Sequence, residues 1–326
     1  MAYNSPKQRN NLILQFTCAI VLYILCAVMI FRQNAMETYT LIHIWSPFFQ
    51  TPMAEMLGDI LTLLLLFINS VILKTYLTNN NLIELRDYRV VNYYLLFSFA
   101  FPYTLNIVAL LFEVCFLYFM FPKLLVVGNT ERSPNNFIYG FICGMISIVY
   151  HPFIFVMLLI YVSYLVDRSV NAKKIIMPIL GFLLAFVYYF AFLYLTNQGM
   201  KETVSAYFSN YFSAYHVALE RISGLLVTIS FALILMMLFI KLYGHMRLVS
   251  SNINKRKKYF MIFFTCLYIC VISMFLINAN FYLTAILVIS ASLLIGLTLT
   301  FYNKRSVINM ISVAFFLIVL YNNFAI

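Results

Sequence analysis

Residues 12–31 read LILQFTCAIVLYILCAVMIF, a run of 20 residues without a charged side chain. About 20 consecutive apolar residues allow a helix to cross the hydrocarbon core of a bilayer. Lys7 and Arg9 precede the run and Arg32 follows it, with no small-x-small cleavage site before Arg32. The stretch therefore predicts a retained first membrane span rather than a cleaved signal peptide.

Similar apolar runs recur along the whole chain. Hydrophobic residues make up 64% of its 326 residues and charged residues 10%, whereas a soluble domain is nearer half apolar and about a quarter charged. We mark eleven segments: 12–31, 57–77, 91–103, 104–121, 137–150, 152–166, 175–196, 222–243, 259–277, 281–301 and 306–323. They predict an all-α, polytopic transmembrane helical bundle, with residues 1–326 forming a single integral membrane domain.

Four of these segments are short and form two pairs, each divided by a proline. The first pair is divided near Phe101-Pro102-Tyr103 and the second at His151-Pro152. Proline lacks an N–H donor and disfavours helical geometry in the residue before it. Each pair is therefore either two helices that meet at a tight break or one long kinked helix. The prediction is accordingly a bundle of about nine to eleven spans.

The Lys and Arg residues alternate between one gap and the next. Eighteen of the 21 lie in the N-terminal tail or in every second gap after it, and the other gaps hold only Arg32, Lys201 and Arg221. Because cytoplasmic loops keep the positive charges, the N-terminus is predicted to be cytoplasmic and the C-terminus periplasmic. The same rule and contact with anionic lipid headgroups explain the net charge of +11 without a nucleic-acid partner.

The sequence lacks the motifs of several enzyme classes. It contains no P-loop, GxGxxG, HExxH or GxSxG motif, which excludes a pump with its own nucleotide site. All six cysteines lie in apolar segments without a CxxC pair, so we predict that they are buried packing thiols. No spacing of Cys and His predicts a metal, haem or iron–sulfur site.

Two predicted outer loops, 32–56 and 197–221, carry polar residues suited to chemistry. Carboxylates outnumber basic residues on the outer side: Glu37, Glu55, Asp59, Glu202 and Glu220. Three histidines fall there too: His43, His151 and His216. Such a rim would bind a divalent cation or act as a general base. The alternative is that these acids have no joint role, because Asp and Glu follow no sidedness rule.

Glu113 is the one acid deep within a predicted span. An ionisable residue inside a membrane is costly, and is by default a hypothesis of function. The alternative is a structural Glu that is protonated or hydrogen-bonded to Asn106 or to Tyr or Ser neighbours. His151, at the second proline break, is either a contact for an anionic headgroup or substrate, or a histidine satisfied within its turn.

Residues 139–155, YGFICGMISIVYHPFIF, resemble a helix pair in an uncharacterised family of multi-pass inner-membrane proteins from the Bacteroidota. Three further stretches fit the same family: Ser46-Pro47 before the second span, Arg168 to Lys174 after the helix pair, and Asn303-Lys304-Arg305 before the last span. The resemblance implies an inner-membrane protein of envelope biogenesis, and it supplies no catalytic residue. Many members have an acid directly after the proline that matches Pro102, where this chain has Tyr103.

The layout is also similar, more remotely, to GT-C-like membrane glycosyltransferases that use polyprenyl-phosphate sugars. That resemblance implies a catalytic base at Glu37, supported by Glu55 or Asp59. It places Arg221 or His216 at the lipid phosphate. The implied enzyme is a lipid-linked glycan transferase or polymerase at the periplasmic face. A carboxylate would deprotonate the acceptor hydroxyl while basic groups stabilise the leaving phosphate. Apart from a divalent cation at the outer carboxylates, no cofactor is predicted.

Two other functions stay open. A transporter or flippase would use the broken helices as its substrate site, with Glu113 as the coupling acid. A non-catalytic membrane subunit of an envelope complex would act through membrane-protein partners, and it fits the scarcity of convergent polar residues. The sequence thus predicts the architecture and its sidedness, while enzyme, transporter and subunit remain alternatives.

Overall fold

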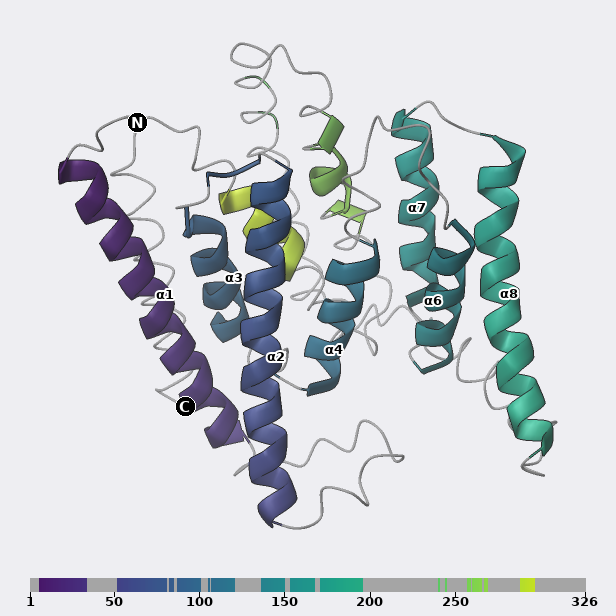
Figure 1. Cartoon of the computed structure of the whole chain (residues 1–326), viewed down its shortest axis with the longest axis horizontal. Helices are drawn as coiled ribbons and strands as arrows, with labels where there is room; N and C mark the ends of the chain where they lie inside the picture. The colour runs from purple at the N-terminus through teal and green to yellow at the C-terminus, as the bar shows by residue number, and fades with distance from the viewer. Residues whose placement is uncertain are drawn as a thin grey trace, which may run out of the picture. The chain divides into compact units, whose positions relative to one another are not determined.

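A computed structural model (Figure 1) shows a helical protein. It describes residues 6–33, 52–80, 82–84, 87–100, 105, 107–120, 136–149, 153–167, 171–195, 240, 244, 257–258, 260–265, 267–268 and 288–296. Within these ranges the chain is helical apart from short turns and contains no strand. The predicted all-α fold class is therefore confirmed.

Three helices are long and apolar enough to cross a membrane: α1 (Pro6–Gln33), α2 (Pro52–Asn79) and α8 (Ala172–Leu195). Their apolar stretches are Ile13–Phe31, Met56–Asn79 and the whole of α8. Large apolar side chains are exposed along all three helices, as suits contact with lipid rather than water. By length and composition these helices are compatible with a membrane protein, whereas the multi-pass insertion, the span count and the orientation stay predictions.

The remaining helices with described bounds are shorter. They are α3 (Arg89–Ala100), α4 (Ile107–Cys115), the π-helix η3 (Phe116–Met120), α6 (Asn136–Val149) and α7 (Ile154–Asp167). The chain divides into two compact units, residues 1–117 with 288–326 and residues 118–287. The single integral membrane domain over 1–326 stays a prediction.

In the first unit, the first proline-broken pair, α3 and α4, is a helical hairpin by its hydrogen bonding. Figure 1 draws the two helices separately, on either side of α2. Tyr94 in α3 donates a hydrogen bond to Glu113 in α4. These residues are 19 positions apart, a spacing that would separate them by about 28 Å along one continuous helix. The chain therefore turns back between Ala100 and Ile107. This excludes one long kinked helix at the first break.

The hairpin packs against the other helices of the first unit. Both of its arms contact α2, and α3 also contacts α1. Residues 288–296 return from far along the chain as a buried helix. A Cβ on Gly296 would lie 2.6 Å from Cγ2 of Val90, so glycine allows this helix to approach α3 closely.

In the second unit, α6 and α8 pack with their backbones in contact. A Cβ on Gly140 would lie 1.9 Å from the carbonyl oxygen of Pro178, and one on Gly181 would lie 2.1 Å from that of Phe137. Gly144 faces Ala185, whose Cβ would be 2.7 Å away from an added Cβ. Small residues four positions apart let membrane helices approach in this way.

The described cysteines only partly follow their prediction as buried packing thiols. Cys26 and Cys143 are buried, and Cys115 is half-buried. Cys18 is exposed on α1, so the prediction is wrong for this residue. Its helix face carries other exposed apolar side chains, such as Leu14 and Val21, and a small thiol is compatible with a lipid-facing position.

Candidate functional site

The predicted site residues are unevenly covered by the structure. Four lie outside the described residues: Glu37, His151, His216 and Arg221. Glu55 lies in the first turn of α2, without a described side chain. Asp59 and Glu113 are described in full. The convergence of the outer acids with Arg221, and a divalent cation between them, therefore stay predictions.

Asp59 and Glu113 do not share a site. Asp59 lies in α2 and is 6% exposed. Glu113 contacts Asn69 of the same helix, and the ten residues from Asp59 to Asn69 correspond to about 15 Å along the axis. The two carboxyl groups are therefore at different levels of the first unit.

Glu113 is fully buried, with 0% of its surface exposed. The Tyr94 hydroxyl of α3 donates a hydrogen bond to its Oε2 atom. The side-chain Nδ2 of Asn69 in α2 donates to the same oxygen over 3.0 Å. Three helices thus contribute one polar side chain each, and we call Asn69, Tyr94 and Glu113 the carboxyl cluster.

The hairpin register explains why Tyr94 and Glu113 meet. Tyr94 lies six residues before the end of α3, and Glu113 lies six residues after the start of α4. Equal distances from the break place the two residues at one height. Asn69 lies close to the centre of the apolar stretch Met56–Asn79, which puts the carboxyl cluster near the middle of a potential span.

The hydrogen bonds of Asn69 fix the orientation of its amide. Its Nδ2 atom also donates to the carbonyl oxygen of Leu110 over 3.2 Å. A carbonyl can only accept, so the NH₂ group must face Leu110 and Glu113. Two buried oxygens, Oδ1 of Asn69 and Oε1 of Glu113, have no hydrogen-bond partner among the described residues.

The surroundings of the carboxyl cluster are apolar. Leu66, Leu110 and Phe116 are fully buried in the same unit. In α1, Cys26 donates from its Sγ atom to the carbonyl oxygen of Leu95, the residue after Tyr94, over 3.6 Å. No Lys or Arg of the described residues forms an ion pair with Glu113.

The π-helix η3 begins three residues after Glu113. Single π-helical turns are frequent at functional sites. Sequence reasoning identified Glu113 and a Tyr neighbour, but it missed Asn69; Asn106, named there instead, lies outside the described residues. The available signal was an amide in the middle of the apolar run of α2.

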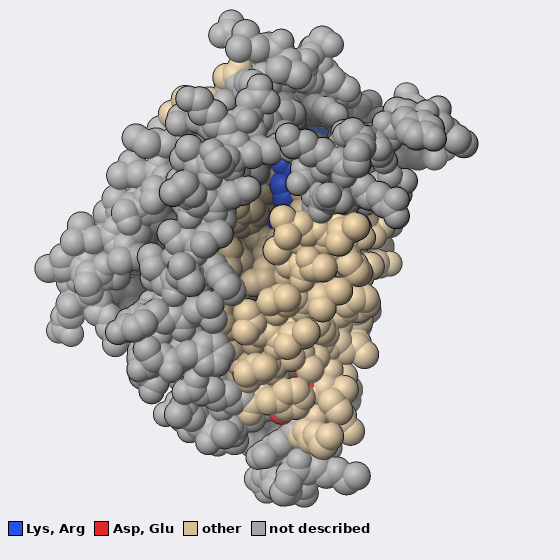
Figure 2. Space-filling model, turned by 90° about the vertical axis from the view of Figure 1, so that its left-hand side faces the viewer, with Lys and Arg blue, Asp and Glu red and all other residues tan. Residues whose placement is uncertain are grey.

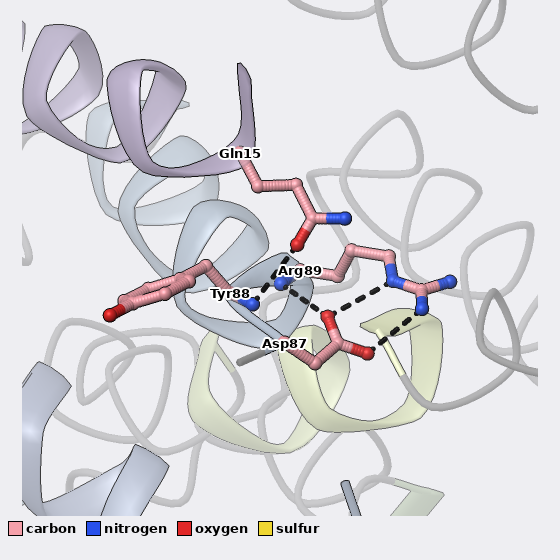
Figure 3. Close-up of polar contacts among 4 residues, drawn as sticks. All are labelled: Gln15, Asp87, Tyr88 and Arg89. Atoms are coloured by element: carbon pink, nitrogen blue, oxygen red, sulfur yellow. Dashed lines mark hydrogen bonds and ion pairs between the residues drawn. The ribbon is translucent and has the colours of Figure 1, made fainter. Parts of the chain in front are cut away.

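A second polar cluster joins α1 to the start of α3 (Figure 3). Oδ1 of Asp87 accepts hydrogen bonds from the backbone N–H and the Nε of Arg89, both over 3.0 Å, and its Oδ2 lies 2.9 Å from Nη2 of Arg89. The backbone N–H of Tyr88 donates to Gln15 of α1 over 3.2 Å. The Lys74 ammonium of α2 lies 3.3 Å from the centroid of the Tyr88 ring.

This second cluster lies at the end of the first unit that the charge pattern predicts to be cytoplasmic. The described surface in Figure 2 is largely uncharged, with Lys and Arg atoms towards one end and Asp and Glu atoms towards the other. A lysine over an aromatic ring at the end of an apolar helix is typical of a membrane interface. We interpret the cluster as an anchor rather than a reaction site.

Among the described residues, no group of three or more His, Cys, Asp or Glu side chains could hold a metal ion. Comparison of the chain with protein-family models, curated proteins and solved structures finds no match. The resemblances to the Bacteroidota family and to GT-C-like enzymes therefore stay predictions. Function has to be argued from the carboxyl cluster itself.

Proposed function

We propose that the chain is a multi-pass inner-membrane transporter or flippase that uses Glu113 as its coupling acid. The observation that supports this is a fully buried carboxyl group that receives hydrogen bonds from two other helices and pairs with no basic side chain among the described residues. An isolated ionised carboxylate in apolar surroundings is strongly disfavoured. A residue this costly fits a group that binds and releases an ion during transport.

The position of the carboxyl cluster supports the same function. Transporters commonly hold their substrates and coupling ions near the bilayer midplane, beside interrupted helices. Asn69 lies near the middle of the apolar stretch of α2, and Glu113 belongs to a hairpin made of two short helices. The cluster thus combines an ionisable group, a central level and an interrupted span.

A lipid-linked glycan transferase at the periplasmic face is the second candidate. Asp59 supports it, because this carboxyl group is 6% exposed and lies seven residues after the start of α2 at Pro52, the end that is predicted to be on the outer side. In this proposal Asp59 assists Glu37 and Glu55 as a base, while Arg221, His216 and His151 contact the phosphate of a polyprenyl-linked sugar.

Two conservative variants distinguish these candidate functions when each is expressed in a strain from which the gene for this protein is deleted. Glu113→Gln keeps the shape of the buried side chain but cannot release a proton or carry a charge. We expect it to abolish rescue of the growth or envelope defect at wild-type protein levels, measured by immunoblot of the membrane fraction. Rescue equal to wild type by Glu113→Gln would overturn the transport proposal.

Asp59→Asn provides the complementary test in the same strain. Loss of rescue with Asp59→Asn, together with full rescue by Glu113→Gln, would favour the transferase. Full rescue by both variants would favour a non-catalytic subunit of an envelope complex, because such a subunit needs the fold but neither carboxyl group. Each comparison is made at matched amounts of protein in the membrane.

A further inference from the structure

We propose that the coupling ion is a proton, bound to Oε1 of Glu113 and shared with Oδ1 of Asn69 in an acid–amide pair. The role of this proton in transport rests on the proposed function. The pair itself can be tested without transport, because it is a statement about two side chains.

The first argument is the uneven use of the two carboxyl oxygens. Both donors, the Tyr94 hydroxyl and Nδ2 of Asn69, bond to Oε2 of Glu113. Oε1 is equally buried and accepts no bond from the described residues. In a neutral carboxylic acid the carbonyl oxygen accepts through two lone pairs while the hydroxyl oxygen donates. The observed pattern assigns the carbonyl to Oε2 and the hydroxyl to Oε1.

The second argument is that the amide of Asn69 supplies the hydrogen-bond acceptor that a protonated Glu113 needs. A hydroxyl at Oε1 needs an acceptor, and Oδ1 of Asn69 is a buried acceptor without a described partner. The two groups are already joined by the bond from Nδ2 to Oε2, 3.0 Å long. A second bond, from Oε1–H to Oδ1, would close an acid–amide ring. One proton would thereby satisfy both oxygens.

Other ligands fit this pair of oxygens less well. Both free atoms are acceptors, which excludes an anion. A hard metal cation requires about six oxygen ligands, whereas the buried Leu66, Leu110 and Phe116 each lie three residues from Asn69 or Glu113 along the chain and offer none from their side chains. A proton needs one oxygen to carry it and one to accept from it, and the pair provides both.

Release of the proton would change how α2 and α4 are held together. The ionised Glu113 would turn a second acceptor towards Oδ1 of Asn69, so the ring bond would be lost and the oxygens would repel. Tyr94 from α3 is the titratable group in direct contact, and Cys26 from α1 bonds to the residue beside it. Among the described residues, neither a Lys nor an Arg offsets the new charge.

Infrared spectroscopy of the full chain in lipid vesicles tests this proposal directly. We expect the C=O band of a protonated carboxyl group, shifted by ¹³C-labelled glutamate, that weakens as the pH rises. The band should be absent in Glu113→Gln. In Asn69→Ala it should remain but move to higher frequency, because the hydroxyl loses its acceptor. Asn69→Thr, closer in size, serves if the alanine variant does not fold.

Asn92→Ala is the matched control. Asn92 also has a buried Oδ1 without a described partner, but its Nδ2 donates to the backbone of Gln15 over 3.1 Å, away from Glu113. This variant should leave the band where it is. A band that moves equally in the Asn69 and Asn92 variants would overturn the acid–amide pair.

Two further outcomes distinguish this proposal from the proposed function. If sodium ions, rather than pH, change a carboxylate band that Glu113→Gln abolishes, the coupling ion is a metal cation; the proton proposal fails and ion coupling survives. If the acid band is present and shifts in Asn69→Ala while Glu113→Gln still rescues the deletion strain, the pair is structural and the transport proposal fails.

Discussion

The two units of the chain join their helices in opposite ways. In the first unit, α2, α3 and α4 meet through the side chains of Asn69, Tyr94 and Glu113. In the second unit, α6 and α8 meet backbone to backbone, across Gly140 and Gly181. The glycine joint contains no group whose charge can change, whereas one proton alters the bonding of the carboxyl cluster. We infer that the contact between α2, α3 and α4 can change with the protonation of Glu113, whereas the contact between α6 and α8 stays fixed.

The largest effect is expected at the glycine joint. Valine at Gly181 would place its Cβ 2.1 Å from the carbonyl oxygen of Phe137, and backbone on both helices cannot give way as a flexible side chain can. Overpacking costs about 1–3 kcal/mol even in ordinary cores, so we expect Gly181→Val to abolish the folded form. Size-exclusion chromatography and thermal unfolding in mild detergent would measure this.

Gly244→Val is the control for that prediction, because a Cβ on Gly244 meets no atom within 4 Å. It should change the free energy of unfolding by less than about 1 kcal/mol, because valine is no worse than glycine within a helix. If both variants unfold alike, close packing of α6 and α8 is not what glycine provides. If both fold normally, the helices separate readily and the joint is not permanent.

The two joints also differ in how far the sequence predicted them. Long apolar runs identified α1, α2 and α8, because length and composition alone decide whether a helix can span a bilayer. Gly140 and Gly144 lie in the stretch 139–155, which resembles a helix pair, but their partners Gly181 and Ala185 lie in an apolar run that no motif marks. The spacing of two glycines does not show which helix packs against them, because that depends on tertiary packing.

The carboxyl cluster was predictable only in part. Glu113 was visible as an acid in an apolar run, whereas Asn69 was not, because one amide in such a run has no distinctive spacing. Pro102 is compatible with a kink as well as with a turn, so only the contact between Tyr94 and Glu113 decides for a hairpin. The π-helix after Glu113 interrupts the predicted segment 104–121 without a sequence signal.

A smaller effect is expected at the carboxyl cluster, and its size should depend on the replacement. Glu113→Leu would remove the acceptor that Tyr94 and Asn69 share, leaving buried donors unpaired at a cost of about 1–3 kcal/mol. Glu113→Gln keeps an acceptor oxygen and adds a donor where the proposed proton sits, so it should unfold close to the wild-type temperature. Thermal unfolding of the purified variants compares them.

Equal unfolding temperatures for the two Glu113 variants would mean that the hydrogen bonds of this side chain contribute nothing to the fold. Destabilisation by Glu113→Gln alone would mean that the charge of Glu113, rather than its hydrogen bonds, is required. We expect Glu113→Leu to unfold at a clearly lower temperature than Glu113→Gln. That order alone is consistent with a stable state in which the carboxyl group of Glu113 is neutral and hydrogen-bonded. That state is the one from which a transport cycle could start.

The smallest effect is expected at the anchor formed by Asp87 and Arg89, which resembles neither joint. Asp87 binds both the guanidinium and the backbone N–H of Arg89, but the Arg89 side chain is 26% exposed, so water and salt weaken the pair. Asp87→Ala should cost roughly 0.5–1 kcal/mol, the value of a helix cap with a partly exposed ion pair. Glu84→Ala, at an exposed acid nearby, is the control.

Because screening acts on charges near water, added salt should reduce the effect of Asp87→Ala but leave that of Glu113→Leu unchanged. The same salt response at both positions would mean that the carboxyl cluster is reached by water, and the distinction between a buried switch and a surface anchor would not hold.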